Sequence, residues 1–144
     1  MTEYVFDTEP FLAFFYEEPG HEEVADLLNG IDAGDARGAL AEVNASELLY
    51  KIARIEGADG TATPASLRTA DRDVRSLTRR GITVQRADWR LVGEVKAAGG
   101  LSLADAHAVA LAHKRDATLV VGGDGDFEEL SLDVDLFRFR DHGV

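Results

Sequence analysis

Four acidic residues lie in separate stretches of the chain, each where an apolar run gives way to a predicted helix or loop. They are Asp7, Glu47, Asp105 and Asp124. Carboxylates gathered at one edge of a sheet raise one another's pKa unless a cation lies between them. An all-oxygen ligand set suits hard divalent ions, so the pattern predicts a Mg²⁺ or Mn²⁺ site that acts on phosphodiesters.

The composition is that of one globular domain. With 144 residues, 45% of them hydrophobic and 29% charged, we expect a single domain over 1–144. No apolar run reaches the roughly 18 residues of a membrane span, and the acidic start Met1-Thr2-Glu3 does not resemble a signal peptide. We therefore expect a cytoplasmic protein without membrane association. The absence of cysteine excludes disulfides, thiolate zinc sites and cysteine nucleophiles.

The net charge of -12 argues against nonspecific nucleic-acid binding through a broadly basic surface. A nuclease remains compatible with this charge, because a bound metal and a local arginine cluster reverse the field in a cleft. Of the 15 basic residues, 12 are arginine and 3 are lysine. This acid-rich, lysine-poor composition favours a halophilic archaeon, where molar salt shortens the Debye length to ~3 Å. The alternative is an acidic mesophilic protein.

Apolar periodicity and glycine or proline breaks predict alternating strands and helices. The predicted strands are 3–6, 39–43, 82–84, 117–121 and 136–139, and the predicted helices are 10–15, 21–28, 45–56, 65–80, 87–98 and 103–114. This alternation predicts an α/β fold with a parallel sheet covered on both faces. Such sheets bind ligands beyond the carboxyl ends of their strands, where we expect Asp7 and Asp124 directly. Glu47 and Asp105 would reach the same edge from the first turns of helices.

Each acid also has a purely structural interpretation. The segment Asn44-Ala45-Ser46-Glu47 has the form of a capping box, and Ser102-Leu103-Ala104-Asp105 has the looser form. Asp7 would cap the helix after Pro10, and Asp124 would stabilise a glycine turn. Because all four acids fall at strand ends or helix starts, a shared site explains them together better than four separate caps.

Four motifs in this order resemble those of PIN domains, and more narrowly of VapC-type toxin ribonucleases. The motifs are Val5-Phe6-Asp7-Thr8, residues 43–54 around Glu47, Leu101-Ser102-Leu103-Ala104-Asp105-Ala106, and residues 119–127 around Asp124. The resemblance implies a three-layer α/β/α fold with a central, mostly parallel sheet. It places the metal-binding and catalytic acids on Asp7, Glu47, Asp105 and Asp124, adds Asp126 as an acid that binds through water, and sets Thr8 and Asn44 around the site.

The same resemblance implies a divalent-metal-dependent endoribonuclease that hydrolyses RNA phosphodiester bonds. It further implies the toxin of a type II toxin-antitoxin pair, a small antitoxin partner and a homodimer. The alternative is a PIN-like nucleic-acid-binding or scaffold module without turnover. The chain departs from the family pattern at Ala41 and Gly122, where many members carry a hydroxyl. These two departures remove hydrogen bonds around the carboxylates but not the carboxylates themselves.

Arginines recur on one predicted helix at helical spacing. Arg68, Arg72, Arg75 and Arg79 share one face of the segment 65–80, with Asp71 and Asp73 between them. The first interpretation is a solvated face with internal ion pairs. The alternative is that basic residues supply phosphate contacts, from either Arg79 and Arg80 or Arg138 and Arg140.

Overall fold

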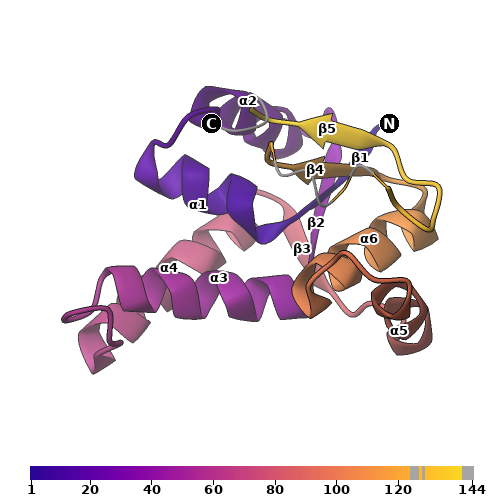
Figure 1. Ribbon diagram of the computed structural model, residues 1–144. Coiled ribbons are helices and arrows are strands. Elements are labelled where there is room, and N and C mark those ends of the chain that lie inside the picture. Colours follow the sequence, from indigo (N-terminus) through magenta and orange to yellow (C-terminus); the bar gives the residue numbers. More distant parts are fainter. Residues whose placement is uncertain (124–126, 128, 141–144) are drawn as a thin grey trace.

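The computed structural model describes residues 1–123, 127 and 129–140, and its centre is a parallel sheet (Figure 1). Its strands are β1 (Glu3–Phe6), β2 (Arg37–Ala41), β3 (Ile82–Gln85), β4 (Thr118–Val121) and β5 (Leu136–Arg138). The strand order is β3-β2-β1-β4-β5, and each of the four neighbouring pairs is parallel. The predicted α/β class with a parallel sheet is confirmed.

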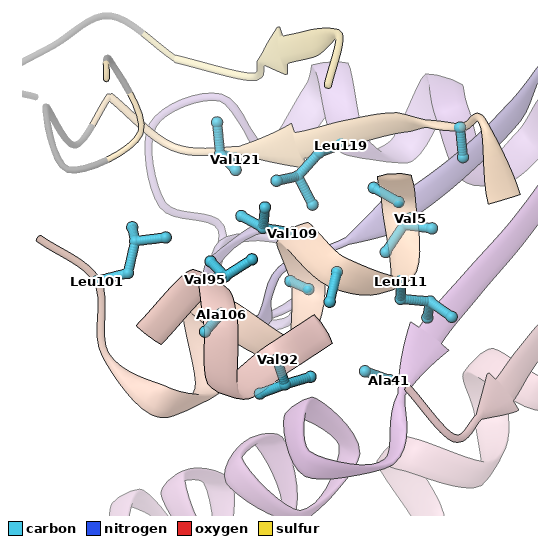
Figure 2. Close-up of a cluster of buried hydrophobic side chains, with 14 of the residues drawn as sticks. Val5, Ala41, Val92, Val95, Leu101, Ala106, Val109, Leu111, Leu119 and Val121 are labelled. Carbon is cyan, nitrogen blue, oxygen red and sulfur yellow. The ribbon is translucent and has the colours of Figure 1, made fainter. Parts of the chain in front are cut away.

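Helices cover both faces of this sheet. They are α1 (Thr8–Tyr16), α2 (His21–Asp32), α3 (Glu42–Ile55), α4 (Pro64–Arg79), α5 (Trp89–Ala97) and α6 (Leu103–Arg115). Alternate residues of each strand point to opposite faces. Phe6, Leu40 and Val120 therefore pack with α1–α4. Val5 and Leu119 pack with α5 and α6 in the second core (Figure 2). The two cores give the predicted three layers.

The helix boundaries differ from the sequence predictions by up to four residues. The first helix begins at Thr8 and α3 begins at Glu42, two and three residues before their predicted starts. The helix α2 runs through the predicted stop at Asn29 and Gly30 and ends at Asp32. Ile31 lies on the buried face of this last turn and is only 5% exposed. Burial of its side chain offsets the cost of a helical glycine.

The carboxyl end of β1 is the topological switch point of the sheet. β1 pairs with β2 on one side and with β4 on the other. The chain segments that connect the strands on these two sides leave the carboxyl ends of β1 and β4 in opposite directions along the sheet. Asp7 follows β1 directly, and its backbone N–H donates to the Val120 carbonyl at 3.1 Å. The fold therefore fixes Asp7 where parallel sheets bind ligands. No helix within the described residues is long and apolar enough to cross a bilayer.

Candidate metal centre

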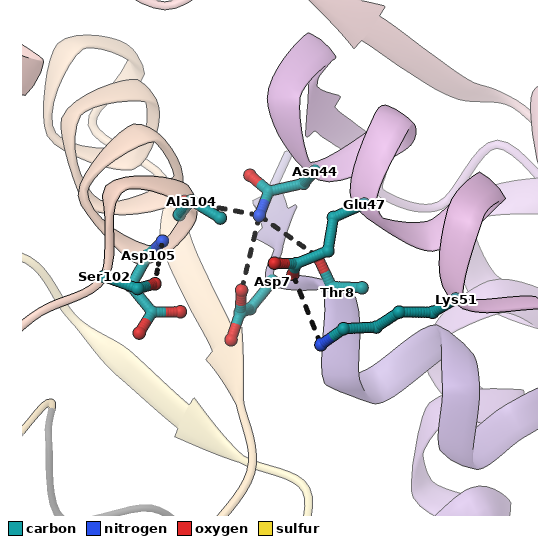
Figure 3. Close-up of polar contacts among 8 residues, drawn as sticks. All are labelled: Asp7, Thr8, Asn44, Glu47, Lys51, Ser102, Ala104 and Asp105. Carbon is teal, nitrogen blue, oxygen red and sulfur yellow. Dashed lines mark hydrogen bonds and ion pairs between the residues drawn. The ribbon is translucent and has the colours of Figure 1, made fainter. Parts of the chain in front are cut away.

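Asp7 is a buried carboxylate at the start of α1. It is the N-cap residue, with φ −71° and ψ 174°, yet its side chain makes no capping hydrogen bond. Only 5% of the residue is exposed. The interpretation of Asp7 as a structural cap is therefore wrong. Its carboxylate instead lies between the N-terminal turns of α3 and α6 (Figure 3).

Asn44 ties Asp7 to two other elements. Its Nδ2 lies 3.4 Å from Asp7 Oδ1, 3.2 Å from Thr8 Oγ1 and 3.3 Å from the Ala104 carbonyl oxygen (Figure 3). The residue is fully buried. Since α3 begins at Glu42, with Ala41 as an N-cap that offers no side-chain bond, the capping box proposed for Asn44 is also wrong. The structure thus places Asn44 beside Asp7 and Thr8, and its role in a metal site stays a prediction.

Glu47 lies one turn beyond Asn44 on α3 and reaches toward the same space (Figure 3). Its Oε1 lies 3.9 Å from Nζ of Lys51, which follows at i+4. The Glu47 side chain is 19% exposed and the Lys51 side chain 44%. Lys51 is not among the residues predicted for the site, although its i+4 spacing from a candidate acid was the available signal. Lys51 supplies positive charge at the border of an otherwise acidic site.

Asp105 enters the site from the first turn of α6. Its backbone N–H donates to Ser102 Oγ at 3.1 Å, which confirms the helix cap expected from that motif. The cap uses the backbone of Asp105, so it is compatible with a functional carboxylate. That carboxylate lies close enough to Asp7 to raise the Asp7 pKa. Asp105 and Asp7 thus face a common space from two different elements (Figure 3).

The electrostatics of this cluster oppose a negative charge on Asp7. Burial, together with the neighbouring Asp105, Glu47 and Glu9 carboxylates, raises the Asp7 pKa from 3.8 to about 8, although a hydrogen bond from the Thr8 backbone lowers it. A bound cation would reverse this balance, because it stabilises the ionised carboxylate. The site in its described form is therefore short of positive charge.

The donor atoms fit a hard divalent ion. The converging groups are carboxylate oxygens, and Asn44 Oδ1 is a buried acceptor without a hydrogen-bond partner. Within residues 1–123, 127 and 129–140, no three acidic or histidine side chains are grouped closely enough to hold an ion. Two of the predicted ligands, Asp124 and Asp126, lie outside the described residues. The described acids thus form part of the ligand set that the sequence predicts.

Glu9 explains the missing hydroxyl at Gly122. A Cβ atom at Gly122 would lie 2.6 Å from Glu9 Oε2, so the carboxylate occupies the space that a serine or threonine side chain would fill. Arg140 holds Glu9 there through an ion pair and also donates to the Pro19 carbonyl oxygen at 3.3 Å. Arg138 donates to the Gly122 carbonyl oxygen at 3.2 Å. The departure at Gly122 is thus coupled to an acid that the sequence analysis did not assign to the site.

Replacing Asn44 with alanine is expected to lower the free energy of unfolding by about 2–4 kcal/mol, because it removes buried hydrogen bonds between three elements. Denaturant unfolding measures this loss. Asn29→Ala is a matched control, since Asn29 is exposed and accepts one hydrogen bond, from Arg80. An equal effect of the two substitutions would contradict the role given to Asn44.

Gly122→Ser is expected to lower the free energy of unfolding by about 1–2 kcal/mol, because its Cβ displaces the Glu9 carboxylate from Arg140. The same substitution should cost less in a Glu9→Ala background, and a double-mutant cycle measures that coupling. Gly93→Ser is the control, since a Cβ at Gly93 meets no atom within 4 Å. Strictly additive effects of Gly122→Ser and Glu9→Ala would show that the two positions are not coupled.

Comparisons with known proteins identify the fold and the family. A VapBC2 structure from Rickettsia felis, bound to a DNA fragment from its promoter, contains a similar chain, with a TM-score of 0.68, 14% identity and coverage of 95% of this chain and 98% of that one. A DNA-bound VapBC structure from Salmonella typhimurium has a TM-score of 0.67 and 13% identity, and covers 96% of this chain and 99% of that one. FitAcB from Neisseria gonorrhoeae has a TM-score of 0.60 and 15% identity, and covers 94% of this chain and 97% of that one. At these identities the likeness shows the fold. No curated protein matches the chain in sequence. The family model of the PIN domain matches residues 4–132, and the chain belongs to the PIN domain family.

Proposed function

We propose that this protein is a divalent-metal-dependent endoribonuclease of the VapC toxin type. The observation that carries the proposal is the Asp7 carboxylate at the switch point of the sheet, where burial together with the nearby Asp105, Glu47 and Glu9 raises its pKa to about 8. Keeping such a group ionised is unfavourable unless a cation binds. A site that favours a divalent ion at the ligand-binding edge of this fold suits hydrolysis of a phosphodiester.

Each site residue has a defined task in this proposal. A bound Mg²⁺ or Mn²⁺ would polarise the scissile phosphate and lower the pKa of a water molecule. Asp7 is the central ligand, and Asp105, Asp124 and Asp126 complete the metal-binding set. Glu47 either binds the ion or orients the attacking water, beside the positive charge of Lys51. Asn44 holds the Asp7 carboxylate through its side chain and Thr8 holds it through a backbone hydrogen bond.

The expected products are a 5′-phosphate and a 3′-hydroxyl, formed without participation of the RNA 2′-hydroxyl. In-line attack by water on phosphorus needs only the acids and the ion. Among the described residues, no histidine is a cause of the Asp7 pKa shift, and His107 Nδ1 and His113 Nδ1 lie 2.8 Å and 3.1 Å from the backbone carbonyl oxygens of Leu103 and Asp133. Histidine-mediated cleavage through a cyclic phosphate is therefore not supported by the geometry.

The biological part of the proposal is a toxin-antitoxin pair. Three solved structures with this fold are VapBC or FitAcB assemblies, and this supports a small antitoxin as the partner. A homodimer and a location in the cytoplasm belong to the same proposal, which takes them from the family resemblance. An acidic site of this kind suits a partner that inserts a basic side chain.

Incubation of the purified protein with a pooled RNA tests the proposed activity. Cleavage is expected with Mn²⁺, is expected to stop with EDTA, and should leave 5′-phosphate ends. The assay is run in low and in molar KCl, because the acidic composition favours a high-salt environment. RNA binding without cleavage in either salt would instead support the alternative of a PIN-like module without turnover.

A further inference from the structure

We propose that the outer face of α4 is a docking surface for the phosphate backbone of a folded RNA, separate from the metal centre. This surface is the arginine stripe, formed by Arg68, Arg72, Arg75 and Arg79. The inference rests on the proposed function in that it takes RNA as the substrate. It adds a second contact surface that the catalytic mechanism does not use.

Helix geometry aligns the four arginines. Their spacings of four, three and four residues keep them within about 60° of one another around the helix axis, over a length of about 16 Å. The buried residues of α4 (Ser66, Ala70 and Leu77) lie on the opposite side of the helix. All four arginines are exposed. The arginine stripe therefore faces solvent rather than the α3 interface.

Internal ion pairs do not account for the stripe. Its members are neighbours at i+3 or i+4, where like charges repel each other and weaken the helix. Asp71 lies 3.0 Å from Nε of Arg75, and this is the one ion pair within the described residues that involves the stripe. Arg72 also lowers the pKa of Asp73, although that side chain is partly buried and its pKa is raised overall. The solvated-face interpretation therefore holds for Arg75 but leaves the other three arginines unexplained.

The charge of α4 is opposite to that of the rest of the protein. Its four arginines and two aspartates give it a charge of +2, so the remainder of a chain of −12 carries −14. A polyanion is the ligand that gains most from such a surface. Arginine binds phosphate through two parallel hydrogen bonds. A row of about 16 Å is long enough to contact several successive phosphates of one strand.

An RNA fits this face better than a protein partner. The core of a stable protein interface is depleted of charged residues and buries roughly 800 Å² on each partner. The arginine stripe instead presents a continuous row of cations. A row of cations suits an RNA backbone, because it can contact successive phosphates. Such contacts position the RNA without reading its sequence.

The position of α4 restricts the size of the RNA. The helix packs along α3, which carries Asn44 and Glu47 of the metal centre (Figure 1). Packed helices lie about 8–10 Å apart, and the stripe is on the far side of α4 from α3. An RNA must therefore extend beyond the cleaved strand to reach both surfaces. We expect a stem or another folded element to contact the arginine stripe while a single strand enters the metal centre.

The test measures binding of a labelled RNA hairpin with a single-stranded loop, in EDTA to prevent cleavage, over a series of KCl concentrations. The variant Arg68→Ala/Arg72→Ala/Arg79→Ala should weaken binding by about 10- to 100-fold and reduce the slope of log affinity against log salt by roughly 2 to 3. The control Arg37→Ala/Arg86→Ala/Arg90→Ala removes the same charge from exposed positions on other elements. It should weaken binding less than about threefold.

Cleavage of a short single-stranded RNA with Mn²⁺ separates this inference from the proposed function. The stripe variant should cleave the short RNA at the wild-type rate and the hairpin more slowly at subsaturating concentration. Equal loss of hairpin binding in both triple variants would overturn the arginine stripe as a specific surface. A wild-type dimer in sedimentation that the stripe variant loses would assign the face to a second copy instead. Stripe-dependent binding without cleavage of either RNA would overturn only the proposed activity.

Discussion

Replacing Asp7 with asparagine is expected to reduce metal-dependent RNA cleavage by more than ~100-fold, because loss of a direct ligand should exceed the 10- to 100-fold cost of losing an outer-shell partner. The same variant should be more stable than the wild type at pH 8 without metal. The native pKa of Asp7 is about 8 against an ordinary value of 3.8, so ionisation opposes folding as pH rises through this range. Asparagine keeps the shape of the side chain and removes the charge. We expect a gain of at least about 2 kcal/mol at pH 8 and a much smaller change at pH 4.

Activity and unfolding assays of the same samples separate a lost ligand from a lost fold. Asp32→Asn is a suitable control, since Asp32 is an exposed residue at the end of α2. It should change neither cleavage nor the pH dependence of stability. An Asp7→Asn protein that still cleaved RNA at the wild-type rate would remove Asp7 from the mechanism. A variant that was inactive because it had unfolded would contradict the assigned electrostatics.

The affinity for Mn²⁺ is expected to rise about tenfold per pH unit between pH 6 and pH 7 and to level off above pH 8. In the metal-free protein the raised pKa keeps Asp7 protonated below pH 8, so the ion must displace a proton before the carboxylate can bind it. Metal-free stability should fall over the same range, because the folded state holds a proton that the unfolded state has already released. Both trends follow from one group whose pKa is raised in the folded protein.

Calorimetry in buffers of different ionisation enthalpy measures the protons released on binding. Release of nearly one proton at pH 7 is expected for the wild type. The Asp7→Asn variant should bind more weakly and lose this pH dependence. An affinity that stays constant from pH 6 to pH 8 would show that Asp7 is already ionised in the metal-free protein.

The sequence was sufficient to predict which strands and helices form, and that Glu47 and Asp105 lie near Asp7. Alternating apolar runs and helical stripes predicted all five strands, and parallel pairing then brings their carboxyl ends to one edge. The position of Asp7 at this edge follows from strand pairing alone, because Asp7 directly follows a buried strand. Glu47 and Asp105 also required the helices to begin near the same edge, as α3 and α6 do.

Asn44 shows why the remaining details needed the structure. A capping motif predicts a role only if the helix begins at that residue, and α3 begins at Glu42 instead. Asn44 therefore lies within the first turn of α3, and its side chain points toward Asp7. The contact of Glu9 with Arg140 joins residues 131 positions apart, and no local pattern predicts such a pair. The roles given to Asp124 and Asp126 stay predictions, since both lie outside the described residues.

A crystal of the wild-type protein soaked with Mn²⁺ tests the metal centre most directly, through the anomalous scattering of the ion. We expect a peak at roughly 2.0–2.3 Å from an Asp7 carboxylate oxygen, with Asp105 in the same coordination sphere or one water away, and no peak there in Asp7→Asn crystals. A protein that cleaves RNA with Mn²⁺ while its ion lies away from Asp7 would contradict the central claim.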